Sequence, residues 1–292
     1  MKIVHADEIA TITASKHREG ASVRQRLLDG PPGALDGYSL VIARPQDRYS
    51  PRHRHNFEQF RYQIEGIANY SRTGKLHPGM IGYFPEGVHY GPQVQEPGQD
   101  LCLLTLQFGG AGGGGYAGRT AVMEATEELL KLGTFKDGVF HRNPGVPGKK
   151  NVDGFQAIWE HINKRPLTYP KPRYDAPVLI HPDNFEWVPV EGSPGAYQKV
   201  VGVFTERRTQ AGFVKLEQGA RYPAGGGRDI FFVISGTGTV DDQDYRKFTT
   251  VELKEGEKVA FTARGATEIL NLRLPNLEGL RVEQAGELQA AE

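Results

Sequence analysis

The stretch that decides the fold reads SPRHRHNFEQFRYQIEG, at residues 50–66. On a β-strand, side chains two positions apart point to the same face of the sheet. His53, His55, Gln59 and Arg61 then share one face, while the apolar side chains that follow them alternate onto the other. If this polar face points into a barrel, the barrel interior is not a purely apolar core. The pattern therefore predicts a binding site inside the barrel.

The histidines of the chain gather around this stretch. Four of the nine lie between positions 53 and 89, and none follows position 181. Two imidazoles on the same face of a strand can share one metal ion. We therefore expect His53 and His55 to bind a metal ion together.

Short strands separated by turns extend in both directions from the histidine segment. Candidate strands occupy residues 38–44, 57–64, 67–72, 80–84 and 101–108, and a similar pattern returns after residue 176. The chain has 37 Gly and 19 Pro in 292 residues, which is the composition of a fold with many turns. This pattern predicts an all-β fold of sandwich or barrel type.

Two predicted helices separate the strand-rich blocks. They cover residues 120–132 and 153–165, and the second is followed by prolines that cannot continue a helix. We expect two copies of one β-architecture joined by a short helical bridge. The domains would be an N-terminal barrel at 1–115, a helical linker at 116–175 and a degenerate C-terminal barrel at 176–292.

A glycine-rich segment, GGAGGGG at residues 109–115, follows the first block. Gly110, Gly112 and Gly115 satisfy the spacing of a dinucleotide-binding loop, which also requires a second parallel strand about 30 residues later. The following residues are turn and loop instead. A flexible linker is therefore the favoured interpretation, with a phosphate-binding loop as the alternative.

The histidine segment resembles the cupin superfamily, whose first motif is G(x)5HxH(x)3–4E(x)6G. His53, His55, position 59 and Gly66 reproduce that spacing, and Gly79, Pro85 and Gly87 reproduce part of the second motif. The resemblance implies two jelly-roll barrels of the double-stranded β-helix type, covering residues from about 36 to 285. It also implies that His53, His55, Gln59 and His89 hold a divalent metal ion. Gln59 stands where the family has Glu, and His89 precedes the position of the second-motif histidine, Tyr90, by one residue.

Within this superfamily, HRHNFEQFRYQIEG is most similar to a strand of gentisate-type ring-cleaving dioxygenases, which carry an Arg at the position of Arg61. The resemblance implies Fe(II), with Mn, Ni or Zn also suited to these ligands, and a small carboxylated substrate, perhaps an aromatic one. Gln59 would hydrogen-bond a ligand of the metal. Arg61 would bind the substrate carboxylate or pair with a carboxylate of the core. The alternatives are a non-oxidative lyase or isomerase, and a small-ligand-binding protein without turnover.

The second block lacks the imidazoles of the first. When its closing Gly236 is aligned with Gly66, the histidine positions become Pro223 and Gly225, and the Glu position becomes Asp229. We therefore expect the C-terminal barrel to be structural, or to serve as a dimerisation or lid element.

Charge and cysteine content exclude several classes of protein. Lys+Arg and Asp+Glu both number 35, so a broad nucleic-acid or anionic-membrane surface is not expected. The single cysteine, Cys102, permits no intrachain disulfide. No apolar run reaches membrane-spanning length, and the first twenty residues lack the apolar centre of a signal peptide. We expect a cytoplasmic homodimer whose partner is a small anionic substrate.

Overall fold

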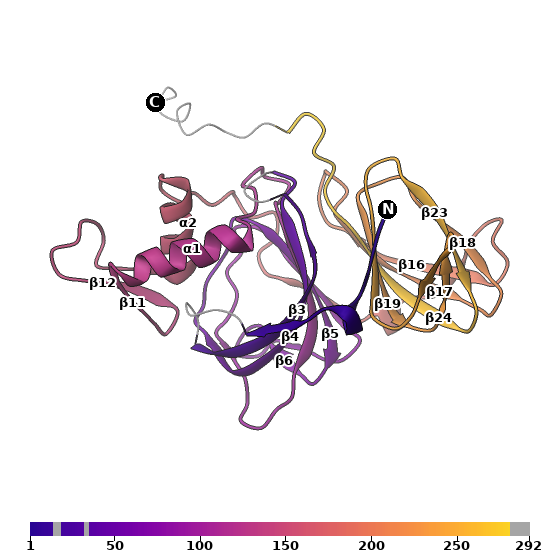
Figure 1. Cartoon of the computed structure of the whole chain (residues 1–292), viewed down its shortest axis with the longest axis horizontal. Helices are drawn as coiled ribbons and strands as arrows, with labels where there is room; N and C mark the ends of the chain where they lie inside the picture. Colours follow the sequence, from indigo (N-terminus) through magenta and orange to yellow (C-terminus); the bar gives the residue numbers. More distant parts are fainter. Residues whose placement is uncertain (14–18, 32–34, 281–292) are drawn as a thin grey trace. The chain divides into compact units, whose positions relative to one another are not determined.

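Strands form most of both halves of the chain, as the sequence pattern predicts (Figure 1). The computed structural model describes residues 1–13, 19–31 and 35–280. These residues form two units, one spanning Thr11–Leu179 and the other combining Met1–Ala10 with Ile180–Glu278. We call them the first and the second barrel. The end of the predicted C-terminal domain, residues 281–292, lies outside the described residues.

The main sheet of the first barrel is antiparallel and has the order β14-β8-β5-β10-β4-β3-β2, with β9 paired to β4. A two-stranded sheet of β6 and β7 adds to it. The strands are β2 (Thr11–Thr13), β3 (Glu19–Asp29), β4 (Tyr38–Ser50), β5 (Glu58–Glu65), β6 (Ala68–Asn69), β7 (Lys75–Leu76), β8 (Ile81–Phe84), β9 (Gln93–Val94), β10 (Cys102–Phe108) and β14 (Val178–Ile180). The histidine segment leads directly into β5, which lies between β8 and β10.

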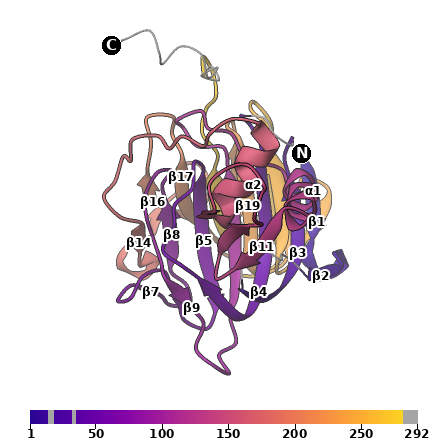
Figure 2. The ribbon, with the colours of Figure 1, turned by 90° about the vertical axis from the view of Figure 1, so that its left-hand side faces the viewer.

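The predicted bridge folds together with the first barrel. It contains α1 (Arg119–Leu130), β11 (Gly133–Lys136), β12 (Val139–Arg142), β13 (Asn151–Asp153) and α2 (Gly154–Asn163). Asp153 caps α2 by accepting hydrogen bonds from the amides of Phe155 and Gln156 at 2.9 and 3.0 Å. The two helices lie side by side (Figures 1 and 2) and enclose a small apolar core around Phe140 and Ile158. This segment is therefore a packed part of the first unit.

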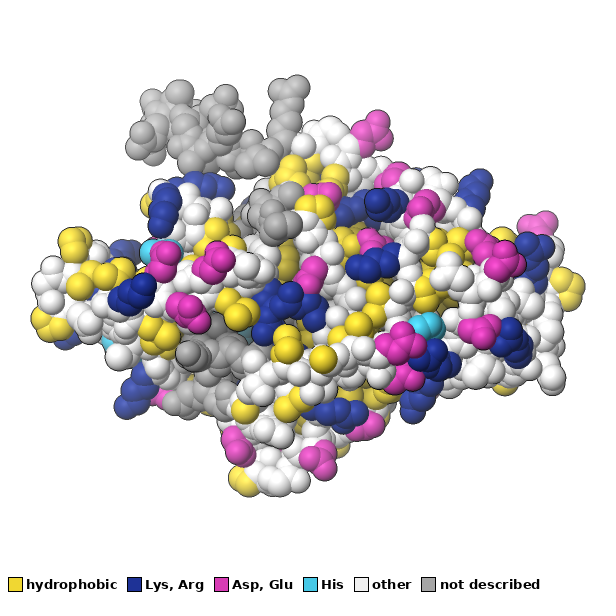
Figure 3. All heavy atoms as spheres, in the orientation of Figure 1, with side chains coloured by type: hydrophobic (Ala, Val, Ile, Leu, Met, Phe, Trp, Pro, Cys, Tyr) yellow, Lys and Arg dark blue, Asp and Glu magenta, His cyan; other side chains and the backbone are white. Residues whose placement is uncertain are grey.

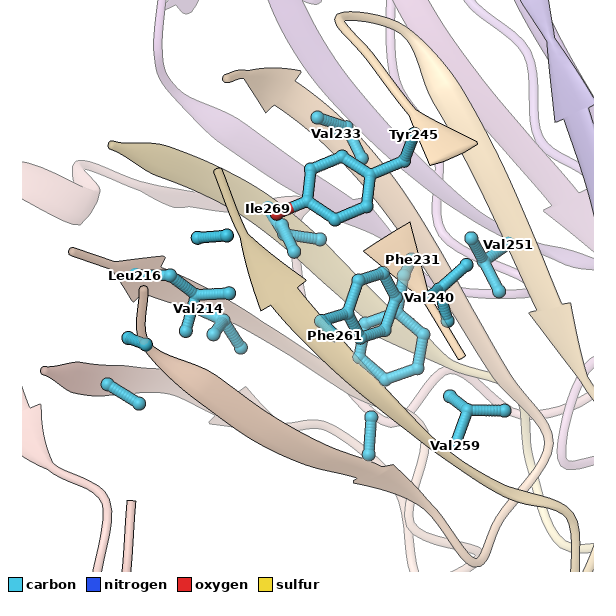
Figure 4. Close-up of a cluster of buried hydrophobic side chains, with 14 of the residues drawn as sticks. Val214, Leu216, Phe231, Val233, Val240, Tyr245, Val251, Val259, Phe261 and Ile269 are labelled. Atoms are coloured by element: carbon cyan, nitrogen blue, oxygen red, sulfur yellow. The ribbon is translucent and has the colours of Figure 1, made fainter. Parts of the chain in front are cut away.

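The second barrel repeats the strand arrangement of the first. Its main sheet has the order β1-β22-β19-β24-β17-β16-β15, and a four-stranded sheet has the order β18-β23-β20-β21. The strands are β1 (Lys2–His5), β15 (Val188–Pro189), β16 (Ala196–Val203), β17 (Gln210–Leu216), β18 (Arg221–Gly225), β19 (Asp229–Ser235), β20 (Gly238–Val240), β21 (Gln243–Tyr245), β22 (Thr249–Leu253), β23 (Lys258–Ala263) and β24 (Thr267–Arg273). Its interior is apolar, and Figure 4 shows Phe231, Val233 and Phe261 within that core.

The first ten residues belong to the second barrel, although the sequence pattern predicted that they belong to the first. Strand β1 pairs with β22 along four residues, from Lys2 opposite Glu252 to His5 opposite Thr249. Arg246 then donates two hydrogen bonds to Asp7, at 2.9 and 2.8 Å, and one to Glu8 at 2.7 Å. These partners lie about 240 positions away in sequence, so the local pattern holds no sign of the pairing.

The structure confirms the predicted all-β class with two jelly-roll barrels. No helix in the described parts of the chain is both long and apolar enough to span a membrane. On the face drawn in Figure 3, basic and acidic side chains are interspersed, in keeping with the balanced charge.

Candidate functional site

Strand β5 carries the polar row that the sequence predicts. Gln59, Arg61 and Gln63 alternate along it, and their side chains are only 1%, 6% and 1% exposed. The neighbouring strands place Gln107 and Thr105 of β10 opposite Gln59 and Arg61. One face of this buried strand thus holds three polar side chains, each of which must find a partner inside the barrel.

His53 and His55 lie together just before β5. Both are buried, and their ring centres are 4.9 Å apart with an angle of 76° between the planes. Two imidazoles that bind one metal ion at about 2.1 Å in near-tetrahedral geometry have ring centres about 5 Å apart. The pair therefore has a separation that suits a shared metal ion.

A backbone carbonyl fixes the orientation of the His53 ring. His53 Nδ1 lies 2.6 Å from the carbonyl oxygen of Pro51. A carbonyl only accepts, so Nδ1 donates in this contact, and a metal ion would bind through the other ring nitrogen, Nε2. Metal-binding histidines are commonly oriented by such a bond on their other nitrogen.

The structure does not bring His89 to the histidine pair; its neighbour Tyr90 lies there instead. Tyr90 forms an isolated antiparallel bridge with His53, through two backbone hydrogen bonds of 2.9 Å. Directly opposite residues point to the same side of a sheet. Tyr90 is therefore buried, with its ring centre 4.4 Å from that of His53, while His89 is exposed. The expectation of His89 as a third ligand is corrected accordingly.

A hydrogen-bond network connects the row on β5 to Tyr90. The Gln59 amide nitrogen donates to the Tyr90 hydroxyl at 2.8 Å, and Arg61 Nη2 donates to the same oxygen at 3.1 Å. The Gln59 carbonyl accepts from Arg61 at 3.0 Å and from Gln107 at 3.2 Å. Tyr116 extends the network by donating to Gln107 at 3.0 Å. Gln59 thus holds Tyr90 and Arg61 in place.

Arg61 is a buried cation without an anionic partner. Among the described residues it forms no ion pair; its partners are neutral, and its guanidinium stacks 4.3 Å from the centre of the Phe84 ring. Burial lowers the pKa of Arg61 from its usual value. Its Nε is buried without a hydrogen bond, and its side chain lines a cavity of about 30 Å³. Of the two expectations for Arg61, pairing with a core carboxylate is not what the structure shows.

Helix α2 packs against His55 through Phe155, a contact that the sequence did not indicate. The Phe155 ring meets the His55 ring edge-on with a centre distance of 4.5 Å, and Phe57 stacks on the other side of His55 at 4.5 Å. Trp159 joins the same apolar cluster. The helix over residues 153–165 was predicted from the sequence, but the side chains against which it packs were not.

The glycine-rich segment is neither a linker nor a phosphate loop. The amide of Ala111 donates to Glu58 at 3.1 Å, and that of Gly112 donates to Glu86 at 2.6 Å. A Cβ at Gly110 would lie 2.2 Å from a Glu86 carboxylate oxygen, so a side chain there would displace the acid. Arg173 pairs with Glu86 at 2.5 Å. Burial and the nearby Glu86 raise the pKa of Glu58 to about 7.

The side chains gathered at this site include two imidazoles that a metal ion could bind. No group of three or more His, Cys, Asp or Glu side chains suited to a metal occurs in residues 1–13, 19–31 and 35–280. Tyr90 and Gln59 add oxygen atoms, but both are already engaged with Arg61. His53 and His55 fit a metal ion whose remaining coordination positions are taken by water or by ligand oxygens.

Comparisons with known proteins establish the architecture. No protein-family model matches the chain, and no curated protein matches its sequence. A candidate dioxygenase from Nostoc punctiforme has a similar structure, with a TM-score of 0.63 and 11% identity over 97% of this chain and 84% of that one. Escherichia coli pirin in complex with nickel(II) gives a TM-score of 0.53 at 10% identity, over 94% and 98% of the two chains.

An oxalate decarboxylase from Lactobacillus farciminis, in a formate complex, is similar as well. Its TM-score is 0.53 at 12% identity, over 94% of this chain and 86% of that one. At these identities the likeness concerns the fold, and the chemistry must be argued from the residues of this chain.

Proposed function

Because the chain has the two-barrel cupin fold, we propose that its first barrel is a metal-dependent enzyme site for a small carboxylate. The observation that carries the proposal is the buried Arg61 guanidinium. It has no anionic partner among the described residues, and Tyr90 connects it to a buried histidine pair. An uncompensated buried charge is costly, and an anionic ligand would offset that cost. The favoured reaction class is an Fe(II) dioxygenase.

Each side chain has a distinct task in this proposal. His53 and His55 hold the metal ion, which when bound would supply open coordination positions for substrate and O2. Arg61 binds the substrate carboxylate through the side of the guanidinium that no protein acceptor occupies. Gln59 and Tyr90 fix that guanidinium, and Phe155 with Phe57 keeps water away from His55.

A consequence is that metal and carboxylate bind cooperatively. The cationic Arg61 disfavours a lone dication nearby, whereas an anion between them attracts both. Two imidazoles alone also leave the metal short of ligands, and a carboxylate oxygen would fill one of the vacant positions.

The test is metal content followed by oxygen uptake. Protein purified without a histidine tag is analysed for bound metals, loaded anaerobically with Fe(II), and mixed with a panel of phenolic and aliphatic carboxylic acids. The proposal expects oxygen uptake with at least one acid, lost in His53→Ala and His55→Ala and retained in His89→Ala. Equal activity in all three variants would overturn it.

Binding without turnover is the second candidate, and a specific observation favours it. Tyr90 replaces the third imidazole and Gln59 replaces the carboxylate, so metal affinity is expected to be lower than in a complete site. A carboxylate that binds through Arg61 equally well in wild type and His53→Ala, with no metal retained by either, would favour this candidate.

A non-oxidative lyase or isomerase would use the same ligands. Turnover of a carboxylic acid by zinc-loaded protein without oxygen uptake would identify that class. The cytoplasmic location and the homodimer stay predictions from the sequence.

A further inference from the structure

Strand register places two further arginines on the inner face of the first barrel. Arg61 of β5 is directly opposite Thr105 of β10. Thr105 is opposite Val41 of β4, which in turn is opposite Arg26 of β3. Directly opposite residues of antiparallel strands point to the same side of the sheet. Arg26 therefore shares the face that carries Arg61, and so does Arg24, two positions earlier on the same strand.

The side chains between the two ends of this row are short. Thr105 and Val41 stand between Arg61 and Arg26, and both are only half-buried. Neighbouring strands lie about 4.8 Å apart, so the three steps from Arg61 to Arg26 span about 14 Å or less on a curved sheet. A ligand held by Arg61 can therefore extend over two small side chains towards β3.

Arg119, the first residue of α1, joins Arg24 and Arg26 in an arginine cluster. Burial lowers the pKa of Arg24, and the cationic Arg119 and Arg26 lower it further, while Tyr116 acts in the opposite sense. Burial also lowers the pKa of Arg119, with Arg26 as the second cause. The three guanidinium groups thus lie close enough to repel one another.

Within the described residues, one carboxylate stands against these three cations. Asp29 accepts from Arg26 at 2.9 Å and attracts Arg119 without a hydrogen bond. Arg24 donates to the neutral hydroxyl of Ser22 at 3.2 Å and has no ion pair in that part of the chain. Arg119 Nε is buried without a hydrogen bond. Three guanidinium groups and one carboxylate leave an excess of two positive charges.

The start of α1 adds to the positive potential around Arg119. Gly118 is the N-cap residue, no side chain caps this end of the 12-residue helix, and its first turn holds no acidic residue. The first amides of a helix lack partners within the helix, and the helix dipole favours an anion at this end. An anion beside Arg119 would be stabilised by the helix as well as by the cluster.

Tyr116 connects the arginine cluster to the site around the histidine pair. Its hydroxyl donates to Gln107 at 3.0 Å, and Gln107 donates to Gln59 at 3.2 Å. The Tyr116 ring meets the Phe57 ring edge-on at 5.2 Å, and Phe57 stacks on His55 at 4.5 Å. The cluster and the histidine pair therefore belong to one continuous set of contacts inside the first barrel.

We propose that the arginine cluster is a second anion subsite of the first barrel, and that the substrate is a dicarboxylate. This inference rests on the proposed function, in which Arg61 binds one carboxylate. The second carboxylate binds Arg24 and Arg119, whose charges Asp29 does not offset. Planar guanidinium groups bind carboxylate oxygens in pairs of parallel hydrogen bonds. The carbon chain of the ligand would then lie over Thr105.

The test is calorimetric titration of the full chain with acetate and with the linear dicarboxylates succinate, adipate and suberate. We expect at least one dicarboxylate to bind about tenfold more tightly than acetate, because it adds a second charge-assisted contact. Arg24→Gln and Arg119→Gln should each weaken that dicarboxylate about tenfold and leave acetate unchanged. Arg72→Gln is the matched control, since Arg72 is exposed in the turn between β6 and β7. Unfolding midpoints confirm that the variants are folded.

The outcomes separate this inference from the proposed function. Equal affinity for acetate and all three dicarboxylates would overturn the subsite, and so would dicarboxylate affinity that Arg24→Gln and Arg119→Gln leave unchanged. Loss of acetate binding in Arg61→Leu would then leave the proposed function standing. Dicarboxylate binding that depends on Arg24 and Arg119 but not on Arg61 would support the subsite and overturn the role of Arg61. Absence of binding for every carboxylate would overturn both.

Discussion

The two barrels use the same strand register to build opposite interiors. In the first, the inward positions of β5 hold Gln59, Arg61 and Gln63; in the second, the equivalent positions of β19 hold Asp229, Phe231 and Val233. Phe231 and Val233 belong to a closed apolar core, whereas Arg61 lines a cavity. The first interior therefore places polar side chains beside a cavity, and the second forms a packed apolar core.

The pair at the start of each strand shows the difference most clearly. Gln59 faces Gln107 across β5 and β10, and Asp229 faces Arg273 across β19 and β24. Gln59 accepts a hydrogen bond from Gln107 and is also bonded to Arg61 and Tyr90, so the neutral pair is part of a wider network. Arg273 donates two hydrogen bonds to Asp229, so the two charges neutralise each other at the end of the apolar core. The neutral pair thus belongs to a polar network beside Arg61, and the charged pair belongs to the scaffold of the second barrel.

The largest expected effect tests the scaffold. Phe231→Ala should lower the free energy of unfolding by about 3–5 kcal/mol, because a large side chain is removed from a closed core. Urea unfolding monitored by Trp187, in a Trp159→Phe background, reports on the second barrel. Phe185→Ala is the control, since Phe185 is 38% exposed and should change stability little. A comparably small loss in Phe231→Ala would contradict the account of a packed interior.

A pH titration tests a second difference between the barrels. Glu58 has its pKa raised to about 7 by burial and by Glu86, against an ordinary value of 4.5. A raised acid pKa stabilises the fold fully below pH 4.5, and that stability is lost as pH rises towards 7. The first barrel should lose about 3 kcal/mol over this range, measured through Trp159 in a Trp187→Phe background.

The matched variant for this titration is Glu58→Gln, which removes the titrating group. Because a glutamine does not ionise, the free energy of unfolding of this variant should not show the fall that ionisation of Glu58 causes between pH 4.5 and 7. The second barrel has Arg228 at the equivalent strand position and should show no such loss. A loss of the same size in both barrels, or one that persists in Glu58→Gln, would refute the assignment to Glu58.

Replacing Arg61 separates binding from stability. Arg61→Leu should weaken the binding of acetate by about ten- to a hundredfold, the loss expected for a charge-assisted hydrogen bond. Binding of the neutral analogue acetamide should change much less. The free energy of unfolding should stay level or rise, because an apolar side chain replaces a buried charge. If acetate and acetamide lose affinity equally, Arg61 does not recognise the carboxylate.

The smallest effect concerns Gln59→Glu. A carboxylate at this position should raise metal affinity about tenfold, since it adds a better ligand than an amide. It should also weaken acetate binding, because the new carboxylate would pair with Arg61 as Asp229 pairs with Arg273. Titrating the same variant with metal and with acetate checks the expected rise in metal affinity and the expected fall in acetate affinity. Tighter acetate binding would contradict the hydrogen-bond network around Arg61.

Much of the architecture was predictable because it depends on local alternation. Four strands begin within one residue of their predicted first residues; they span 38–50, 58–65, 81–84 and 102–108. Both helices also begin within one residue of their predicted first residues. The proximity of His53 and His55 followed from their spacing alone. The predicted burial of the polar row on β5 was also correct, because alternation fixes the face of a side chain within one strand.

What could not be predicted depends on partners distant in sequence. The inward position of Tyr90 in place of His89 is set by its bridge to His53, after a turn through which alternation cannot be counted. The glycine-rich segment is held in position because its backbone amides donate hydrogen bonds to the buried Glu58 and Glu86. The choice between a core partner and a substrate for Arg61 required knowing that no carboxylate in the described part of the chain pairs with it.

The central claim, that the first barrel holds the metal and the second does not, is tested most directly by anomalous diffraction from zinc-soaked crystals. Zn²⁺ serves as a redox-inert probe, and acetate is present to complete its coordination. The account predicts one strong peak at about 2.0–2.1 Å from Nε2 of His53 and from a ring nitrogen of His55, with no peak in the interior of the second barrel. A map without density between the two imidazoles at saturating zinc, or zinc bound at His89 instead, would contradict it.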